Sequence, residues 1–416
     1  MRGIYKLNYL LIEPKTKAIA PNIALMKWAR WCENNEHNYR YIHGIVVPDI
    51  IPDYILMSCI FSYYSEKYET TIDYYRKSFP NIKMIIGGGF PSLTPKFFKK
   101  DKWTAKTVEF FLGGDSSNLK IYSGINQEIE NLVPKYNVKI YEEEGEEDSY
   151  SRNKIVLYAS RGCTNKCGYC AVPKLEGAMK SFKSIQSTLD VAKEELPNAT
   201  SVVLYDNNFT EHEYFDNIVD ELKAFGKPVD IHGLHVDAFT RHHAKRFSEL
   251  TWGAQGEKGT AYLRFSFDKI KYADHIDRAL GYVTEANIKA SFFCYMLFNW
   301  IDSPSDFWKR IVIAQSITEK HGRTIFLFPQ RFEPFMALKR NTYIGKKWDD
   351  ELVRGVTKMY TFLHGFIPVT KTHNVFNWIG HTEEEFIQRA REMVKTNKLI
   401  KKECDPPTMK QLLKTI

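Results

Sequence analysis

The sequence predicts an α/β protein in which a Rossmann-like, doubly wound parallel sheet is followed by a second series of strand–helix units and a helical C-terminal tail. Two observations predict this fold class. Apolar strands alternate with helical segments along most of the chain, which is typical of parallel sheets. A chain of 416 residues is also too long for one ordinary core, so we expect two domains.

The first segment, residues 1–140, alternates between the two kinds of element. We expect strands at Asn8–Glu13, Tyr54–Phe61, Lys83–Ile86 and Val108–Leu112, and helices at Pro21–Asn35 and Tyr64–Phe79. Glycines follow two of these strands, at Gly87, Gly88 and Gly89 and at Gly113–Gly114. Glycine allows either a tight turn or a close approach to a ligand, and both explanations stay open.

An acidic run divides the chain. Every position from Glu142 to Asp148 is acidic except Gly145. Because like charges repel and cannot be buried together, we predict an exposed linker over residues 141–153.

The second segment, residues 154–335, repeats strand and helix about six times, and residues 336–416 form a C-terminal extension. We expect strands at Ile155–Ala159, Ser201–Tyr205, Pro228–His232, Ala261–Phe267, Lys289–Leu297 and Thr324–Phe328, and helices near Ile185–Leu196, Glu211–Phe225, Arg241–Leu250, Tyr272–Glu285 and Pro304–Glu319.

Composition limits the location and partners of the protein. No run of about eighteen apolar residues occurs, so we expect no membrane span and no secretory signal. A net charge of +8 allows an acidic partner without requiring one. We interpret the basic stretch Lys395–Lys402 as a solvated tail, and nucleic acid is not indicated as a partner. Cys32, Cys59, Cys294 and Cys404 lie far apart and suggest no disulfides, which fits a reducing cytoplasm.

Three further cysteines are the most informative residues. Cys163, Cys167 and Cys170 fall within eight positions, and the next cysteine or histidine along the chain is the distant His212. Clustered thiolates favour iron–sulfur clusters, zinc or copper(I). Three thiolates on a four-iron cluster leave one iron open for chemistry, whereas a structural zinc site needs a fourth ligand.

This spacing, with Tyr169 before the last cysteine, resembles the signature of radical S-adenosylmethionine enzymes. The resemblance implies a 4Fe-4S cluster on the three cysteines, with S-adenosylmethionine bound to the open iron. It implies reductive cleavage of that cofactor to a 5′-deoxyadenosyl radical, which abstracts hydrogen from a substrate. It also implies a partial (β/α)6 TIM-type barrel over residues 154–335, and an electron donor of flavodoxin or ferredoxin type.

Cofactor-binding residues are expected at the carboxyl ends of the barrel strands. Asp206 and Asn207 resemble the position where relatives hold the amino group of S-adenosylmethionine, although an N-cap by Asn208 or Thr210 is an alternative.

Arg264, Ser266 and Asp268 alternate along one strand, so they share a face. The resemblance implies that they contact the cofactor's carboxylate and ribose; the alternative is that they face solvent. Tyr295 is expected either to pack an adenine or to fill the core. Arg331 could clamp a substrate carboxylate or phosphate, or lie exposed.

The first segment resembles the cobalamin-binding-type domain of one class of these enzymes. Ser58, Gly87, Gly88 and Gly89 are the expected contacts to cobalamin or substrate. The usual Asp-x-His-x-x-Gly motif is missing, and residues 14–21 read Pro-Lys-Thr-Lys-Ala-Ile-Ala-Pro instead. The domain is therefore either a cobalamin site or a degenerate relic.

Rival functions remain open. A cobalamin-dependent radical methyltransferase is one alternative, and a non-catalytic zinc or nucleic-acid binding protein is another. A transfer-RNA methylthiotransferase would carry three further cysteines in its N-terminal domain for a second cluster, and Cys32 and Cys59 are too few. The substrate and the catalytic residues stay unassigned.

Overall fold

The structure, a computed structural model, describes residues 6–16, 21–98, 108–109, 125–143, 153–253, 260–363, 365–370 and 375–396. The chain forms two compact units. The first unit comprises Met1–Val203 with Pro334–Arg340, and the second comprises Leu204–Glu333 with Asn341–Ile416.

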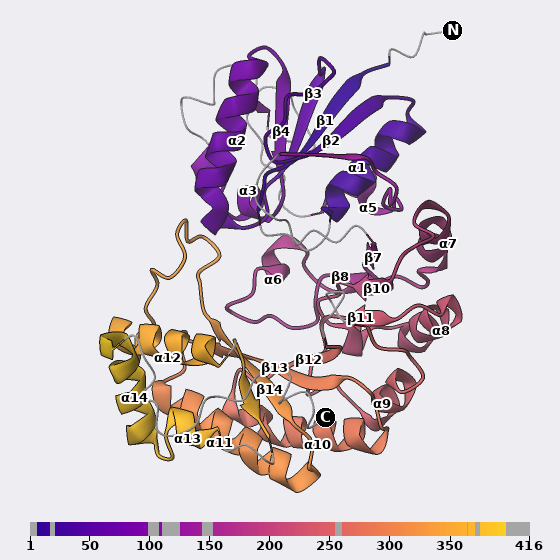
Figure 1. The fold of residues 1–416 in the computed structure, drawn as a ribbon. Helices are drawn as coiled ribbons and strands as arrows, with labels where there is room; N and C mark the ends of the chain where they lie inside the picture. The colour runs from indigo at the N-terminus through magenta and orange to yellow at the C-terminus, as the bar shows by residue number, and fades with distance from the viewer. Residues whose placement is uncertain are drawn as a thin grey trace. The chain divides into compact units, whose positions relative to one another are not determined.

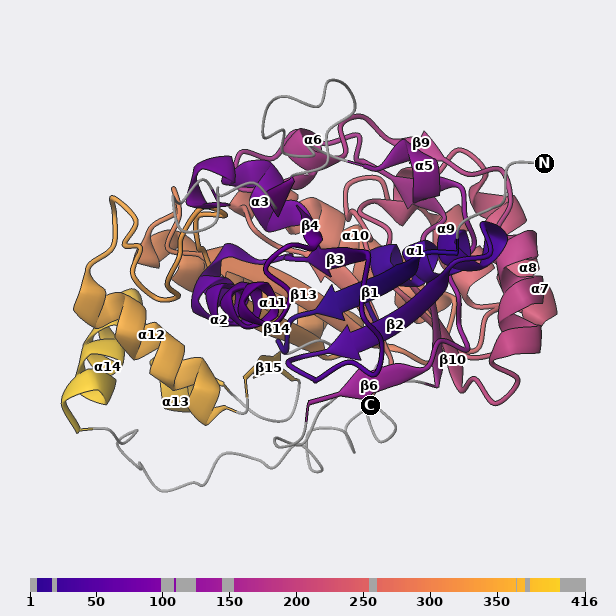
Figure 2. The same ribbon diagram turned by 90° about the horizontal axis from the view of Figure 1, so that it is seen from above.

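Six parallel strands form the sheet of the first unit, in the order β5-β4-β3-β1-β2-β6 (Figures 1 and 2). Because β1 lies between β2 and β3, the strand order reverses at β1, as in doubly wound sheets. The strands are β1 (Asn8–Glu13), β2 (Asn38–His43), β3 (Tyr54–Ser58), β4 (Lys83–Gly87), β5 (Val108–Glu109) and β6 (Ile140–Glu142).

Helices pack on both faces of this sheet. Side chains alternate along a strand, so Tyr9 and Leu10 of β1 point to opposite faces. Tyr9 contacts Trp31 of α1 (Ile23–Asn34), with ring centroids 5.8 Å apart. The opposite face packs on α2 (Ser65–Ser78) in a buried cluster that includes Leu10, Ile12, Tyr68, Ile72 and Tyr75.

The first unit also holds the start of the second predicted segment. β7 (Lys154–Leu157) lies beside β10 (Ser201–Leu204), and the division between the units falls within β10. The remaining elements of this unit are α3 (Gly89–Leu93), α5 (Gln127–Glu130), β8 (Ser160–Arg161), α6 (Val172–Leu175), β9 (Lys180–Ser181) and α7 (Gln186–Glu195).

The second unit contains a four-stranded sheet in the order β12-β13-β14-β15, in which the first three strands are parallel and β15 is antiparallel to β14 (Figures 1 and 2). The strands of this sheet are β12 (Tyr262–Ser266), β13 (Ser291–Phe298), β14 (Ile325–Arg331) and β15 (Ile367–Val369). The second unit also contains β11 (Val229–Ile231), which pairs with β10 in another sheet. Its helices are α8 (Phe215–Phe225), α9 (Arg241–Phe247), α10 (Ala273–Glu285), α11 (Pro304–His321), α12 (Asp350–Phe362), α13 (Phe376–Ile379) and α14 (Glu383–Thr396).

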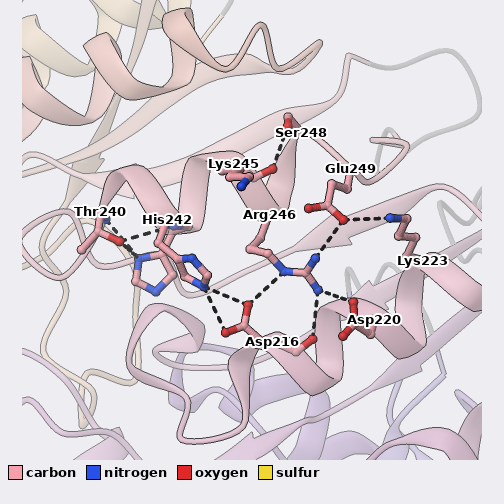
Figure 3. Close-up of polar contacts among 10 residues, drawn as sticks. Asp216, Asp220, Lys223, Thr240, His242, Lys245, Arg246, Ser248 and Glu249 are labelled. Carbon is pink, nitrogen blue, oxygen red and sulfur yellow. Dashed lines mark hydrogen bonds and ion pairs between the residues drawn. The ribbon is translucent and has the colours of Figure 1, made fainter.

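A network of ion pairs joins α8 to α9, and Arg246 is its centre (Figure 3). The Arg246 Nε atom lies 2.9 Å from Asp216 Oδ1, and the guanidinium also pairs with Asp220 and Glu249. His242 Nε2 lies 2.9 Å from the same Asp216 oxygen. Asp216 and Asp220 are exposed, and pairs with exposed carboxylates contribute little individually, so we assign the network to helix packing rather than to a site.

The predicted fold class is confirmed, with local corrections. All six strands predicted for the second segment are present, but they are hydrogen-bonded in separate sheets rather than in one. Ile140–Glu142 forms β6, although residues from 141 onward were predicted as linker. Ile367–Val369 forms β15 within the predicted helical extension, because its apolar side chains are buried beside β14.

Other predictions extend past the described residues. Only Val108–Glu109 of the strand predicted at Val108–Leu112 is described, and Gly113–Gly114 and residues 397–402 of the basic stretch lie outside. Helix α8 begins at Phe215 rather than at Glu211, which belongs to a short 3-10 turn. Within the described ranges, no helix is both long and apolar enough to cross a membrane.

Candidate functional site

The three clustered cysteines lie on a loop whose two ends are paired. β8 and β9 form an antiparallel ladder in which Ser160 pairs with Ser181 and Arg161 with Lys180. Gly162 has φ +76°, and a Cβ atom there would lie 2.3 Å from the Ala178 carbonyl oxygen. Because only glycine tolerates this approach, Gly162 determines how the loop leaves β8. We call residues 162–179 the thiol loop.

Backbone N–H groups are directed at the sulfur atoms of this loop. The Asn165 N–H donates to Cys163 Sγ at 3.4 Å. Burial raises the pKa of the Cys170 thiol, and a hydrogen bond from the Val172 backbone opposes that rise. The nearby Cys167 and Cys163 also raise the Cys170 pKa, so the three sulfurs interact electrostatically. Hydrogen bonds to sulfur are one of the means by which proteins tune iron–sulfur clusters.

The donor set fits a cluster with three protein ligands. In the described part of the chain, no three His, Cys, Asp or Glu side chains already converge as a metal site. Holding a cluster therefore requires the three thiols to turn toward one centre. Cysteine has a single side-chain torsion that positions its sulfur, and all three thiols lie in a partly exposed loop.

The other described cysteines are buried and unreactive. Cys32, Cys59 and Cys294 each have no exposed surface. Burial raises the pKa of Cys32 to about 12 and those of Cys59 and Cys294 well above the ordinary value. Since the thiolate is the metal ligand, these three residues are poor ligands.

Asp206 and Asn207 closely follow β10. Asp206 is buried, with 4% of its surface exposed. Gly233, with φ +73°, brings the connection after β11 against it, because a Cβ atom at Gly233 would lie 2.2 Å from the Asp206 carbonyl oxygen. The predicted N-cap alternative is not seen, since the Asn208 side chain makes no cap bond and α8 begins later.

Arg264 points inward and forms an ion pair with Asp230 of β11. Both side chains are buried, so the predicted solvent-facing alternative is wrong for Arg264. Burial would raise the pKa of Asp230, but the neighbouring His232, whose Nε2 atom lies 3.6 Å from Asp230 Oδ2, and the charge of Arg264 outweigh it and lower that pKa. The guanidinium therefore already has a carboxylate partner within the protein.

Asp268 accepts a hydrogen bond from the Leu297 N–H at 2.7 Å, which ties the end of β12 to the end of β13. The guanidinium of Arg310 on α11 spans the same two strand ends. Its Nη1 atom donates to the Phe267 carbonyl at 3.0 Å and the Leu297 carbonyl at 2.9 Å. Its Nη2 atom lies 3.0 Å from Asp302 Oδ2.

Ser266 and Tyr295 lie side by side, because they are register partners on β12 and β13. Burial raises the pKa of the Tyr295 phenol, and the charge of Arg264 acts against that rise. Tyr295 also makes an edge contact with Phe293, with ring centroids 4.9 Å apart. The contact between these two rings is compatible with either role expected for Tyr295, which is to pack an adenine or to fill the core.

Arg331 at the end of β14 is mostly buried and bound to the protein. Its Nη2 atom donates to the Tyr343 carbonyl at 3.0 Å, and its Nε atom lies 3.6 Å from Glu333 Oε1. Asn299, in the left-handed region at φ +66°, holds the same loop by donating to the Tyr343 carbonyl at 2.9 Å. Arg331 thus supports the loop that contains Tyr343, and the alternative that it lies exposed is wrong.

In the first unit, Ser58 belongs to a buried polar group at the point where the strand order reverses. The Asn22 side chain donates to Ser58 Oγ at 3.0 Å. The Asn22 N–H donates to Glu13 Oε2 at 3.1 Å, and the Tyr41 hydroxyl donates to the same oxygen. Ligands of doubly wound sheets bind at this position, which here is filled by side chains of the protein.

Gly87, the last residue of β4, and the next two glycines differ in how closely the rest of the chain approaches them. Gly88 has φ +105°, and a Cβ atom there would lie 2.3 Å from the Cys59 carbonyl oxygen. At Gly89 a Cβ atom would lie 3.1 Å from the Ile60 carbonyl oxygen, and at Gly87 it would meet nothing within 4 Å. The close approach at Gly88 is therefore to the chain's own backbone.

The sequence prediction did not include Asp230 and Arg310. Each is a charged residue among buried apolar ones: Asp230 between Val229 and Ile231, and Arg310 one helical turn from Phe307 and next to Ile311. A charge on the apolar face of an element signals a buried partner. That signal was present, but the identity of each partner depends on the tertiary fold.

The fold and the thiol loop together resemble those of one class of protein. A doubly wound sheet followed by strand–helix units, with three thiols after the first of those strands, is the arrangement expected of radical S-adenosylmethionine enzymes with a cobalamin-binding-type domain.

Comparisons confirm this resemblance, although no protein-family model matches the chain. Over 138 residues the chain is 28% identical to the ribosomal protein uS12 methylthiotransferase RimO of Clostridium novyi (strain NT), covering 31% of this chain and 29% of that protein. The cobalamin-dependent S-adenosylmethionine radical enzyme OxsB with aqua-cobalamin bound has a similar fold, with a TM-score of 0.51 at 13% identity. Apo OxsB gives a TM-score of 0.52 at 12% identity.

These matches are partial in length. The chain spans 29% of RimO and 52% of OxsB, while 75% of this chain is covered by OxsB. The likeness to OxsB shows the fold alone and does not establish an activity.

Proposed function

We propose that the chain is a radical S-adenosylmethionine enzyme that abstracts hydrogen from a substrate still to be identified. The observation that carries the proposal is the thiol loop, in which Cys163, Cys167 and Cys170 share one closed hairpin after β7. A 4Fe-4S cluster with bound S-adenosylmethionine would supply one-electron cleavage to the 5′-deoxyadenosyl radical.

The residues of the chain have separate roles in this proposal. The three thiols hold the cluster, and the backbone N–H groups of Asn165 and Val172 stabilise sulfur charge. Asp206 binds the amino group of the cofactor. Tyr295 supplies an apolar wall. Because Arg264 is already paired with Asp230, we assign it to that ion pair rather than to binding a carboxylate alone.

The cluster is tested by anaerobic reconstitution. We expect about four iron and four sulfide ions per chain, and loss of both when the three loop cysteines are replaced by alanine. Cys294→Ala is the matched control, since it removes a buried thiol and should leave the iron content unchanged. Zinc at full occupancy without iron would instead favour the zinc-binding alternative.

The role of Asp206 is tested by S-adenosylmethionine binding. A charge-assisted hydrogen bond contributes roughly 1.5–3 kcal/mol, so Asp206→Asn should weaken binding by about tenfold or more and leave the cluster intact. Asp237→Asn, which changes an exposed carboxylate of the same unit, is the control. An unchanged dissociation constant would assign Asp206 to structure alone.

Cobalamin-dependent methyl transfer is a second candidate, favoured by the fold likeness to OxsB. The hydrogen-bonded group around Ser58 and the backbone contact at Gly88 argue against a ligand at that place. The test is to incubate the protein with hydroxocobalamin, desalt it and measure the cobalt that it retains. Stoichiometric cobalt supports methyl transfer, and the loss of cobalt supports a degenerate domain.

Methylthio transfer is a third candidate, favoured by the sequence match to RimO. The described N-terminal cysteines, Cys32 and Cys59, are both buried and have raised pKa values, so they do not supply a second set of ligands. An iron content of about eight rather than about four per chain, the sum for two four-iron clusters, would reverse this preference.

A further inference from the structure

An exposed apolar surface lies in the first unit, beside β3. Eight large hydrophobic side chains are exposed in the described part of the chain, and four of them belong to two short segments. Ile60 and Phe61 follow β3 and are 45% and 49% exposed. Met336 and Leu338 are 55% and 42% exposed. Single exposed hydrophobics are ordinary, whereas a contiguous group marks an interaction site.

Hydrogen bonds show that the two segments are neighbours. Ser62 Oγ donates to the Ala337 carbonyl at 2.6 Å, and Ser65 Oγ donates to the Leu338 carbonyl at 3.3 Å. The guanidinium of Arg340 lies 3.9 Å from the ring centroid of Tyr63. We call residues 334–340 the strap, because these contacts hold it against the residues after β3.

The strap also contacts the thiol loop. Lys174 Nζ lies 4.5 Å from the ring centroid of Phe335 in the strap. Lys174 belongs to α6, which begins two residues after Cys170. The apolar surface is therefore connected through one helical turn to the residues proposed to hold the cluster.

The rim of this surface is basic. Lys174, Lys339 and Arg340 are exposed. Between residues 153 and 189 the sequence has one acidic residue, Glu176, and that residue pairs with Arg161 at 3.1 Å. Glu66 and Lys67 at the start of α2 offset each other. An apolar centre with a basic rim is complementary to a protein surface with apolar side chains and carboxylates.

We propose that this surface, made of Ile60, Phe61, Met336 and Leu338 with the basic rim, docks an acidic electron-donor protein of flavodoxin type. The inference rests on the proposed function, which requires one electron per cleavage. The donor's reduced flavin loses one electron and the cluster gains it, so the charge balances without a further reactant. The apolar centre favours a protein over a nucleic acid, whose interfaces are more polar.

The test separates docking from chemistry. The variant Lys339→Glu/Arg340→Glu is compared with the native protein in 5′-deoxyadenosine formation, driven either by a reduced bacterial flavodoxin or by dithionite. We expect the flavodoxin-driven rate to fall about tenfold or more, because charge reversal at a rim slows association. The dithionite-driven rate should be unchanged.

Lys309→Glu/Arg354→Glu is the matched control, since it makes the same change of charge on exposed residues of the second unit. Met336→Asp is a second variant that tests the apolar centre with the strap's basic side chains intact. Thermal melting establishes that each variant is folded.

The outcomes are distinct. Unchanged flavodoxin-driven rates in both strap variants would overturn the docking proposal. An equal loss with flavodoxin and dithionite would also overturn it, and would assign the surface to the substrate. If the native protein forms no 5′-deoxyadenosine even with dithionite, the proposed function fails; flavodoxin binding, measured by calorimetry on native and variant proteins, then decides the docking proposal separately.

Discussion

The carboxyl ends of the strands are closed in different ways in the two units. In the first unit, an uncharged amide, a hydroxyl and glycine backbone contacts close the ends of β3 and β4, with Glu13 as the one carboxylate among the groups described there. In the second unit, the buried ion pair of Arg310 with Asp302 lies at the ends of β12 and β13, and a second buried pair, Arg264 with Asp230, joins the middles of β12 and β11.

This difference predicts which of the two units tolerates the loss of a side chain at these positions. Buried charges are costly without a partner, so the second unit depends on complete pairs. The first unit depends instead on close backbone packing, which fails when an atom is added rather than removed. Substitutions of buried charges in the second unit and of glycines in the first unit test this contrast.

The largest effect is expected at Arg310. Arg310→Leu leaves Asp302 without its partner and two backbone carbonyls without a donor, so we expect a loss of about 3–5 kcal/mol in the free energy of unfolding. Denaturant unfolding measures it. Arg354→Leu, which removes an exposed pair with Asp350, should cost less than about 1 kcal/mol. Equal effects of the two changes would contradict the contrast.

The pair Arg264–Asp230 should behave as a unit. Arg264→Met and Asp230→Leu should each destabilise the protein by several kcal/mol, while the double variant should recover most of the loss, because a buried pair can be replaced by apolar residues. The same double variant is assayed for S-adenosylmethionine binding. Restored stability with lost binding would give the pair a role in the site; restored stability and binding would make it structural.

A smaller effect is expected at Gly88. Gly88→Ala places a Cβ atom against the Cys59 carbonyl at positive φ, which should cost about 1–3 kcal/mol. Gly87→Ala meets nothing within 4 Å and serves as the control. If Gly88→Ala instead leaves the melting temperature unchanged and alters only the retention of cobalamin, Gly88 contributes to ligand binding rather than to stability.

The smallest effect concerns Glu195 of the first unit, which lies away from the strand ends. Burial would raise the pKa of Glu195, but hydrogen bonds from Arg30 and the Tyr136 N–H outweigh it and lower the pKa below its ordinary value. A lowered carboxyl pKa gives stability that is present above the unfolded value and lost as pH falls through the folded value. Stability should therefore decline as pH falls from about 4.5, and Glu195→Gln should flatten that decline in melting curves.

Much of the fold could be predicted from the sequence, because apolar periodicity is a local signal. The strands at Ser201–Leu204 and Ile325–Arg331 were predicted within a few residues. β2 was missed, since Asn38–His43 mixes polar and aromatic residues. β8 and β9 were missed because two-residue strands have no periodicity at all.

The candidate site was less predictable beyond its cysteines. The spacing of Cys163, Cys167 and Cys170 is local, so the sequence contains it completely. The partner of Arg264 could not be predicted, because Asp230 is 34 residues away and is brought to it only by the packing of β11 against β12. The covering of Ser58 by Asn22 is non-local in the same way.

The burial of the other cysteines has a practical consequence for labelling. Cys32, Cys59 and Cys294 are shielded from solvent, so an alkylating reagent added to the native protein should leave them unmodified. Among the described residues, the thiols of the loop are the ones open to such a reagent. Mass spectrometry of the alkylated peptides would therefore report how many loop thiols are protected in a given preparation, without any substrate being known.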